Sequence, residues 1–263
     1  DTAQSTQWGY DEPALARALR KTGVPRHEVF ITTKIHPKDF GPTTTPKAIH
    51  ESLVRLGTDR IDLVLLHYAQ CWGNICDGAP PPEGTWQDAW AALAQAKSDG
   101  AVRAIGVSNF HVPVLQQLIS FGHTLAVDGT VDLVQDWFDP LHQAAELRST
   151  CKSHRIAFQA YSLLHSSGWE RKHGRNMVLT HPTIISVAEE LSSSPAVVVL
   201  AWALSHDVTV LPRSTNPKHL VDNLAAWTLS LSAEQLARVD AQTKESEKKM
   251  EAQRGVVMQM QQK

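Results

Sequence analysis

Short apolar runs alternate with longer amphipathic stretches along this chain. Runs rich in β-branched residues predict strands at Glu28–Lys34, Ile61–His67, Val102–Ser108, Val131–Trp137, Ile156–Ser162 and Thr209–Arg213. These runs are nearly continuous rather than alternating, as expected of strands that are buried on both faces. A helical stretch follows each run, and this order predicts parallel strands joined by helical crossovers.

Capping residues mark several of the predicted helices. Thr45 and Pro46 form an N-cap and first-turn pair for a helix that ends at Gly57. Thr85, with Asp88 three residues later, begins a helix that ends at Gly100. The other predicted helices begin at Pro13, cover Val112–Ile119, Leu141–His154 and Thr183–Ser192, or open at Ser194-Pro195, Asn216-Pro217 and Ser232.

Two architectures suit this order, the (β/α)8 barrel and an open doubly wound sheet. No Gly-x-Gly-x-x-Gly follows any predicted strand, which counts against the dinucleotide-binding open sheet. The predicted fold class is therefore α/β, a (β/α)8 TIM barrel. We expect the barrel domain to cover residues 1–240 and residues 241–263 to form a polar helical tail, because little apolar face remains there.

Composition narrows the class of protein further. The 263 residues are 42% hydrophobic and carry a net charge of −2, which excludes a disordered chain and a general basic field for nucleic acid. No stretch is long and apolar enough for a membrane span. Cysteine is sparse, so we expect a reducing, cytoplasmic compartment. Cys71 and Cys76 could cross-link under oxidation, but free thiols are the expected state there.

Polar residues stand at the ends of the predicted strands. In a barrel the carboxyl ends of the strands meet at one rim, where chemistry takes place. All six predicted strands become polar at this same end, which ordinary solvent exposure of strand ends does not explain. Read in chain order, they are Lys34, His67, Ser108 with Asn109, Gln135, Tyr161, and Arg213 with Ser214, and Asp1 ends the strand before them.

The runs that contain these residues resemble the successive motifs of the aldo-keto reductase superfamily. The resemblance extends from Asp1 to about Asp240, and its most specific parts are Gly106–Phe110 and the pair Lys34 and His67. The matching segments are Asp1–Ala3, Ile31–Lys34, Asp62–His67, Val102–Phe110 and Leu211–Ser214. The resemblance implies a (β/α)8 barrel that transfers a hydride from NADPH to an aldehyde or ketone, without a metal.

The resemblance also implies catalytic roles. Lys34 and Asp1 would tune a tyrosine proton donor, because an ammonium beside a phenol lowers the pKa of the phenol. His67 would orient the substrate carbonyl. Thr6 stands where the family places the tyrosine, so Tyr10 is the candidate donor.

Cofactor roles follow in the same way. Ser108, Asn109 and Gln135 resemble the set that binds the nicotinamide carboxamide, and Tyr161 resembles the ring on which the nicotinamide stacks. Two family positions differ, since Val134 replaces a carboxamide-binding asparagine and His219 replaces an arginine for the 2′-phosphate. NADPH remains the expected cofactor, bound further by Arg213, Ser214, Thr215, His219 and Asn223.

Residues near the rim are candidates for the substrate wall. Tyr68 and Trp72 belong to the loop that directly follows His67, and His36 lies two residues after Lys34. For Tyr68 and Trp72, plain loop packing is the competing interpretation. The expected partner is a small carbonyl substrate, with no nucleic acid, no membrane and no metal, and the chain is expected to be a monomer.

Against the family plan, the first βα unit and most of strand two are missing. An incomplete barrel would leave bare strand edges, so we expect compromised stability. Two alternatives stay open beside the reductase: a non-catalytic NADP(H)-binding accessory or sensor barrel, and an inactive fragment.

Overall fold

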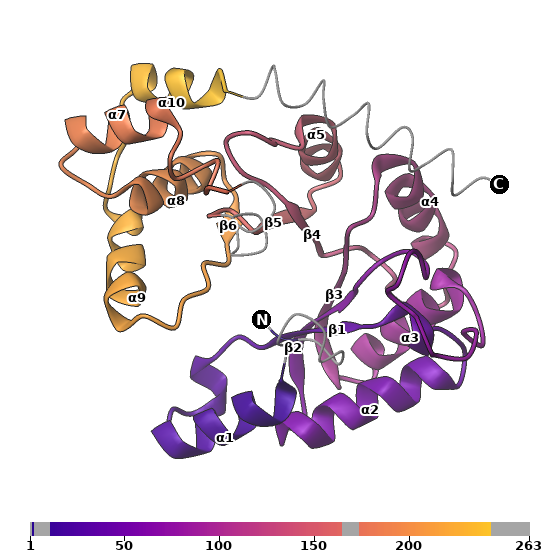
Figure 1. Ribbon diagram of the computed structural model, residues 1–263. Helices are drawn as coiled ribbons and strands as arrows, with labels where there is room; N and C mark the ends of the chain where they lie inside the picture. The colour runs from indigo at the N-terminus through magenta and orange to yellow at the C-terminus, as the bar shows by residue number, and fades with distance from the viewer. Residues whose placement is uncertain (1, 3–10, 165–173, 243–263) are drawn as a thin grey trace. The chain divides into compact units, whose positions relative to one another are not determined.

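The computed structural model describes residue 2, residues 11–164 and residues 174–242 (Figure 1). The chain divides into two compact units. Unit 1 contains Asp1–Gln135 and Ser149–Ala157, and unit 2 contains Asp136–Arg148 and Phe158–Lys263.

Six strands follow one another in chain order in a single sheet. The pairs β1–β2, β2–β3, β3–β4 and β5–β6 are all parallel, as the alternation of strands and helices predicts. The strands are β1 (Thr32–Ile35), β2 (Ile61–Leu66), β3 (Val102–Ser108), β4 (Leu133–Trp137), β5 (Ala157–Tyr161) and β6 (Thr209–Val210).

Helices follow the strands, and most begin where the capping residues predict. The predicted start at Thr45 is wrong, because α2 begins at Thr44 with Thr43 as its N-cap. Gly57 ends its helix with φ 64°, and the capping boxes of Thr85 with Asp88 and of Ser232 with Gln235 are both present. The α-helices are α1 (Glu12–Thr22), α2 (Thr44–Leu56), α3 (Trp86–Ser98), α4 (Val112–Gly122), α5 (Ala145–Ser153), α7 (Pro182–Glu190), α8 (Pro195–Ser205), α9 (Pro217–Leu224) and α10 (Ala233–Asp240). Short 3₁₀ turns cover η2 (Arg26–Glu28), η3 (Pro37–Asp39) and η4 (Ala225–Trp227).

The first and last strands are shorter than predicted. Strand β6 ends at Val210, so Arg213 and Ser214 lie in the loop before α9 and not at a strand end. The run Glu28–Lys34 contributes only its last residues to β1, because η2 occupies the preceding segment. Arg26 holds this turn in place, since its guanidinium donates to the Val29 carbonyl oxygen and to Asp62.

The core of unit 1 lies between its strands and helices. Every residue of β2 is buried, α2 packs on β1, and α3 packs on β2 and β3. The buried Trp90 of α3 donates from Nε1 to the Gly129 carbonyl oxygen at 3.0 Å. Strands β3 and β4 approach closely at Gly106, where a Cβ would overlap the Leu133 carbonyl oxygen. Only glycine allows this pairing.

Two aspartates join neighbouring strands near the amino ends of β2 and β4. Asp62 accepts from the Ile31 amide at 2.8 Å and pairs with Arg26 at 2.7 Å. Asp132 accepts from the Ile105 amide at 2.8 Å and pairs with Lys97 at 2.8 Å. Each carboxylate therefore joins a backbone amide of the neighbouring strand to a cationic side chain.

A buried acid supports β1 from α1. Glu12 accepts from Thr33 Oγ1 at 2.5 Å and from Arg55 Nε at 2.6 Å. The Glu12 side chain is almost fully buried, so its charge requires the Arg55 guanidinium. Because Thr33 precedes Lys34, this contact fixes the strand that carries the predicted active-site lysine.

Unit 2 has its own core around α8. Phe138 stacks on Trp202 with ring centroids 4.7 Å apart and an interplanar angle of 6°. Trp202 Nε1 and His206 Nε2 both lie 2.8 Å from one carboxylate oxygen of Asp240. In this way α10 is held to the buried helix.

The expectation of two free thiols is wrong. Cys71 and Cys76 form a disulfide within the loop between β2 and α3, and the remaining cysteine, Cys151, is a buried thiol outside this disulfide. The expectation rested on the low cysteine content of the whole chain. The pairing depends instead on one short loop, which brings these two residues together.

Among the described residues, no single helix is long and apolar enough to span a membrane. The bent pair of α7 and α8 passes such a test by combined length and composition alone, and α8 is largely buried in unit 2.

Candidate active site

Lys34 and His67 end neighbouring parallel strands of unit 1. The register pairs Lys34 with Leu65, and the His67 amide donates to the Ile35 carbonyl oxygen at 2.9 Å. Lys34 is only 1% exposed and His67 only 4% exposed. A buried lysine is rare in proteins, so this position is a marked feature of the strand end.

The surroundings of His67 keep its ring neutral. Burial, followed by the positive charge of Lys34 and then by His36, lowers the pKa of His67 to about 3. A neutral imidazole has one N–H donor and one acceptor nitrogen, so His67 can hydrogen-bond a polar substrate atom without carrying charge.

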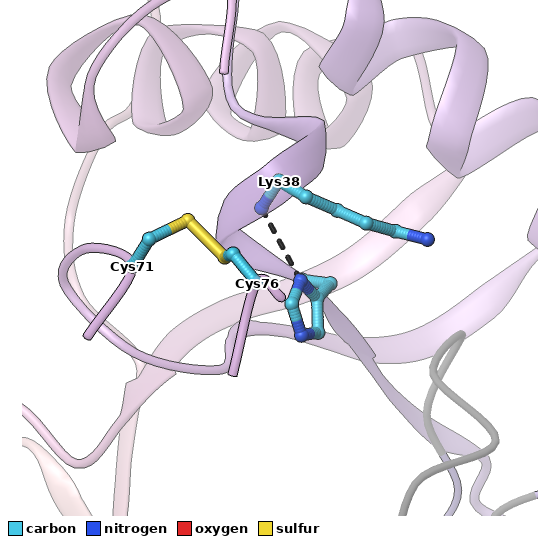
Figure 2. Close-up of a disulfide and its surroundings, with 4 residues drawn as sticks. Lys38, Cys71 and Cys76 are labelled. Carbon is cyan, nitrogen blue, oxygen red and sulfur yellow. Dashed lines mark hydrogen bonds between the residues drawn. A yellow bond between two sulfur atoms is a disulfide. The ribbon is translucent and has the colours of Figure 1, made fainter. Parts of the chain in front are cut away.

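His36 follows Lys34 by two residues and is 2% exposed. Its Nδ1 accepts from the Lys38 amide at 3.2 Å, the bond that is dashed in Figure 2. Its ring also hydrogen-bonds the Ile75 backbone. Burial, with a smaller effect of Lys38, lowers the pKa of His36 to about 4. His36 is therefore a neutral residue that contacts the loop after β2.

The next two strand ends meet beside His67. Ser108 pairs in register with Gln135, and both side chains are buried. Asn109 has a left-handed φ of 59°, and its Nδ2 donates to the His67 carbonyl oxygen at 2.9 Å and to Ser108 Oγ at 3.0 Å. The structure thus brings Ser108, Asn109 and Gln135 together at one edge.

Aromatic rings extend from His67 into the loop that follows it. Tyr68 stacks on His67 with centroids 4.7 Å apart, and Trp72 meets Tyr68 edge-on with centroids 5.9 Å apart. Trp72 remains 44% exposed. Tyr68 and Trp72 therefore form an aromatic wall beside His67, where the sequence predicts substrate contacts.

Unit 2 holds the other predicted cofactor residues. Tyr161 ends β5 and is half-buried, while Arg213 is exposed before α9. At the start of α9, Ser214 Oγ accepts from the Asn216 amide and lies 3.4 Å from His219 Nδ1. Thr215 and His219 are exposed.

Asn223 faces a groove of about 420 Å³ between α8, β6 and α9 in unit 2. A second groove, of about 500 Å³, lies between α2 and α3 in unit 1. Neither groove contains the strand-end residues of unit 1, so we assign the candidate site from those residues and not from the grooves.

Two predicted catalytic residues, Asp1 and Tyr10, lie outside the described residues. The sequence reasoning missed Glu12 and Arg55, which hold the strand of Lys34. Glu12 lies 21 positions from Thr33 and 43 positions from Arg55 in the sequence, so no local motif predicts these contacts. It also missed the hydrogen bond between His36 and the Ile75 backbone.

The edge formed by Ser108, Asn109 and Gln135 fits an amide-bearing cofactor. Hydroxyl and amide side chains offer both donors and acceptors, which a carboxamide group needs. Val134, at the position of the family asparagine, is fully buried and offers no such group. The exposed Arg213 beside the start of α9 suits a phosphate, because a guanidinium and a helix N-terminus both attract anions.

A parallel α/β barrel-like fold with a buried lysine and histidine at adjacent strand ends defines a class of oxidoreductase. The chain belongs to the aldo/keto reductase family, whose model matches residues 1–244. This match confirms the resemblance deduced from the strand-end motifs.

Several relatives agree with this assignment. An aldo-keto reductase of Mycolicibacterium vanbaalenii is 34% identical over 230 residues, which cover 88% of this chain and 74% of the relative. The glyoxal reductase of Bacillus subtilis is 31% identical, with coverage of 89% and 76%. The crystal structure of an aldo/keto reductase from Brucella melitensis has a TM-score of 0.76 at 29% identity, with coverage of 92% and 83%. The similarity confirms the barrel-like fold class.

Proposed function

We propose that this protein reduces an aldehyde or ketone to the alcohol with NADPH, using Tyr10 as proton donor. The observation that carries the proposal is the buried pair of Lys34 and neutral His67 at adjacent strand ends. A cation and a neutral imidazole that are both shielded from water suit a reaction in which negative charge develops on a carbonyl oxygen.

Lys34 would act on the proton donor. Its ammonium would stabilise the phenolate of Tyr10 and lower the pKa of that phenol, which brings proton release closer to neutral pH. Asp1 would in turn keep the lysine charged. This part of the proposal rests on the family resemblance for Asp1 and Tyr10 and on the burial of Lys34.

His67 would position the substrate. Because its ring is neutral above pH 3, it can donate one hydrogen bond to the carbonyl oxygen without competing for the proton. Tyr68 and Trp72 would bind the remainder of the substrate, and His36 would hold the backbone of their loop. The substrate itself is proposed only as a carbonyl compound.

The cofactor would be held by the residues described above. When bound, NADPH supplies a hydride to the carbonyl carbon. Ser108, Asn109 and Gln135 would orient the carboxamide of the nicotinamide, and Tyr161 would stack on its ring. Arg213, Ser214, Thr215 and His219 would bind the adenosine phosphate, and Asn223 the adenine. His219 in place of an arginine predicts a weaker preference for NADPH over NADH.

Titration of the purified chain with NADPH, followed by quenching of tryptophan fluorescence, tests the cofactor part of the proposal. Saturable micromolar binding is expected, and it should accompany NADPH oxidation in the presence of an aldehyde. Binding without turnover would instead indicate a non-catalytic NADP(H)-binding barrel. The absence of both would indicate a chain that resembles a reductase without acting as one.

Two variants test the residues. Tyr10→Phe and Lys34→Met should each lower kcat roughly 100-fold or more while leaving NADPH binding within about twofold. The matched control is Lys47→Met, because Lys47 is exposed on α2 and pairs only with Glu51 among the described residues. Normal turnover by Tyr10→Phe would eliminate Tyr10 as donor.

A further inference from the structure

The loop between β2 and α3 contains a small covalent ring. The disulfide joins Cys71 to Cys76, so the ring encloses Trp72, Gly73, Asn74 and Ile75. Both cysteines are partly exposed, and Gly73 adopts a φ of 53°, which favours the turn. The disulfide crosses one loop and joins no distant elements of the fold.

Two contacts attach this ring to the candidate site. Trp72 meets Tyr68, which stacks on His67. Ile75, whose side chain is buried, hydrogen-bonds the His36 ring through its backbone. His36 bonds the Lys38 amide with Nδ1, so its other ring nitrogen is the donor to the Ile75 carbonyl oxygen. Figure 2 shows the disulfide beside the Lys38 segment.

We propose that the Cys71–Cys76 disulfide is a redox-controlled clasp that fixes the aromatic wall of the substrate site. In the disulfide form, Trp72 is held against Tyr68 and Ile75 is held against His36. After reduction the ring opens, and Trp72 and Ile75 lose the covalent restraint that keeps them beside His67 and His36. The proposal rests on the proposed reductase function for its effect on substrate binding.

The chemistry is thiol–disulfide exchange with a dithiol reductant of the thioredoxin class. One reductant thiolate attacks one cysteine sulfur, the Sγ–Sγ bond breaks, and a mixed disulfide forms. The second reductant thiol then displaces the protein sulfur. Two electrons and two protons pass to Cys71 and Cys76, which become thiols, while the reductant becomes a disulfide. Oxidised glutathione can reverse the exchange.

The rest of the molecule allows this loop to respond alone. A ring of so few residues removes little entropy from the unfolded chain, so its opening leaves the fold intact. Cys151 is 1% exposed within unit 1 and is therefore shielded from exchange. Hence the clasp has one reduced form and one oxidised form.

The full chain tests the clasp through kinetics. Thiol titration of the chain unfolded in urea, which exposes Cys151, should rise from one to three thiols after reduction with dithiothreitol. Reduction should raise KM for 4-nitrobenzaldehyde about fivefold at nearly constant kcat, and it should leave KM for propanal within about twofold. The double variant C71S/C76S should behave as the reduced form under all conditions. The control C151S should respond to reduction as the unchanged protein does.

Hydrogen exchange separates the clasp from the reductase proposal. Reduction should speed amide exchange in residues 68–79, and H36Q should reproduce part of that change without altering the cysteines. Faster exchange in a protein that never oxidises NADPH would retain the clasp as a conformational device while the proposed function fails. Unchanged exchange and unchanged KM in an active enzyme would overturn the clasp, as would three titratable thiols after treatment with oxidised glutathione.

Discussion

The side-chain amide of Asn109 donates a hydrogen bond of 2.9 Å to the backbone carbonyl oxygen of His67. The same amide also donates to Ser108 Oγ. Asn109 therefore joins the end of β2, where the candidate catalytic His67 lies, to the end of β3, where the candidate cofactor residue Ser108 lies. A left-handed backbone places the amide in this position, and asparagine tolerates that conformation better than most residues.

This relationship predicts the effect of removing the amide. Asn109→Ala should lower the free energy of unfolding by about 2 kcal/mol, from the lost hydrogen bonds and from the left-handed φ. It should also lower kcat/KM about tenfold, because His67 and Ser108 are no longer held together. Asn109→Gly is the matched control, since glycine accepts the φ but lacks the amide. It should regain stability without regaining activity, as measured by urea unfolding and steady-state kinetics.

The buried histidines predict a loss of stability in acid. The pKa of His67 is about 3 in the folded protein, whereas an unfolded histidine titrates near 6.5. Between these values the unfolded state binds more protons, so the free energy of unfolding falls as the pH falls. At pH 4.5 the contribution of His67 is roughly 2 to 3 kcal/mol relative to pH 7.

Urea unfolding at pH 7 and pH 4.5 measures this dependence. His67→Asn should reduce the difference in the free energy of unfolding between pH 7 and pH 4.5 by that amount, because the variant lacks the titrating ring. His50→Gln, at an exposed position on α2, should leave the difference unchanged. An equal slope in His67→Asn and the unchanged protein would contradict a neutral, buried His67.

Cofactor preference should depend on position 219. His219 is exposed at the start of α9, beside Ser214, and Arg213 is the other candidate phosphate ligand. His219→Arg should raise the preference for NADPH over NADH about tenfold, since a guanidinium stays charged and binds phosphate with two donors. Arg213→Ala should lower it. The ratio of kcat/KM values for the two cofactors is the measurement, and His219→Gln controls for loss of the native ring.

The ion pair of Glu12 and Arg55 should stabilise the strand of Lys34. Glu12→Gln removes the charge from an almost fully buried position and should cost about 2 kcal/mol in the free energy of unfolding. This loss is below that of a fully buried pair, because Arg55 is 32% exposed. The double variant E12L/R55L removes both charges and should recover part of the loss. Thermal and urea unfolding of the three proteins measure both effects.

Local signals predicted most helix starts, although α2 begins at Thr44 and not after the predicted N-cap Thr45. Caps depend on residues three or four positions apart, so Thr85 with Asp88 and Ser232 with Gln235 could be identified from the sequence alone. Strand interiors were also predictable, because continuous burial of β2 requires a continuous apolar run. The beginning of β1 was not, since the Arg26 contacts that hold the preceding turn span distant positions.

In the candidate site, too, some residues could be predicted from the sequence and others could not. Lys34 and His67 follow from strand ends in a parallel sheet, because topology alone brings such ends together. The support from Glu12 and the hydrogen bond between His36 and Ile75 depend on how separate segments pack, and no spacing predicts them. The Cys71–Cys76 disulfide contradicts the expectation of free thiols, because its formation depends on the turn of one loop.

The paired aspartates near the amino ends of β2 and β4 have a consequence for how this protein can change. Asp62 and Asp132 hold strand register through backbone amides and cations, while the candidate chemistry lies at the opposite, carboxyl ends. Register and reactivity are therefore encoded by different residues. Evolution or a protein engineer can replace the loops that select a substrate while these two carboxylates keep the strands aligned.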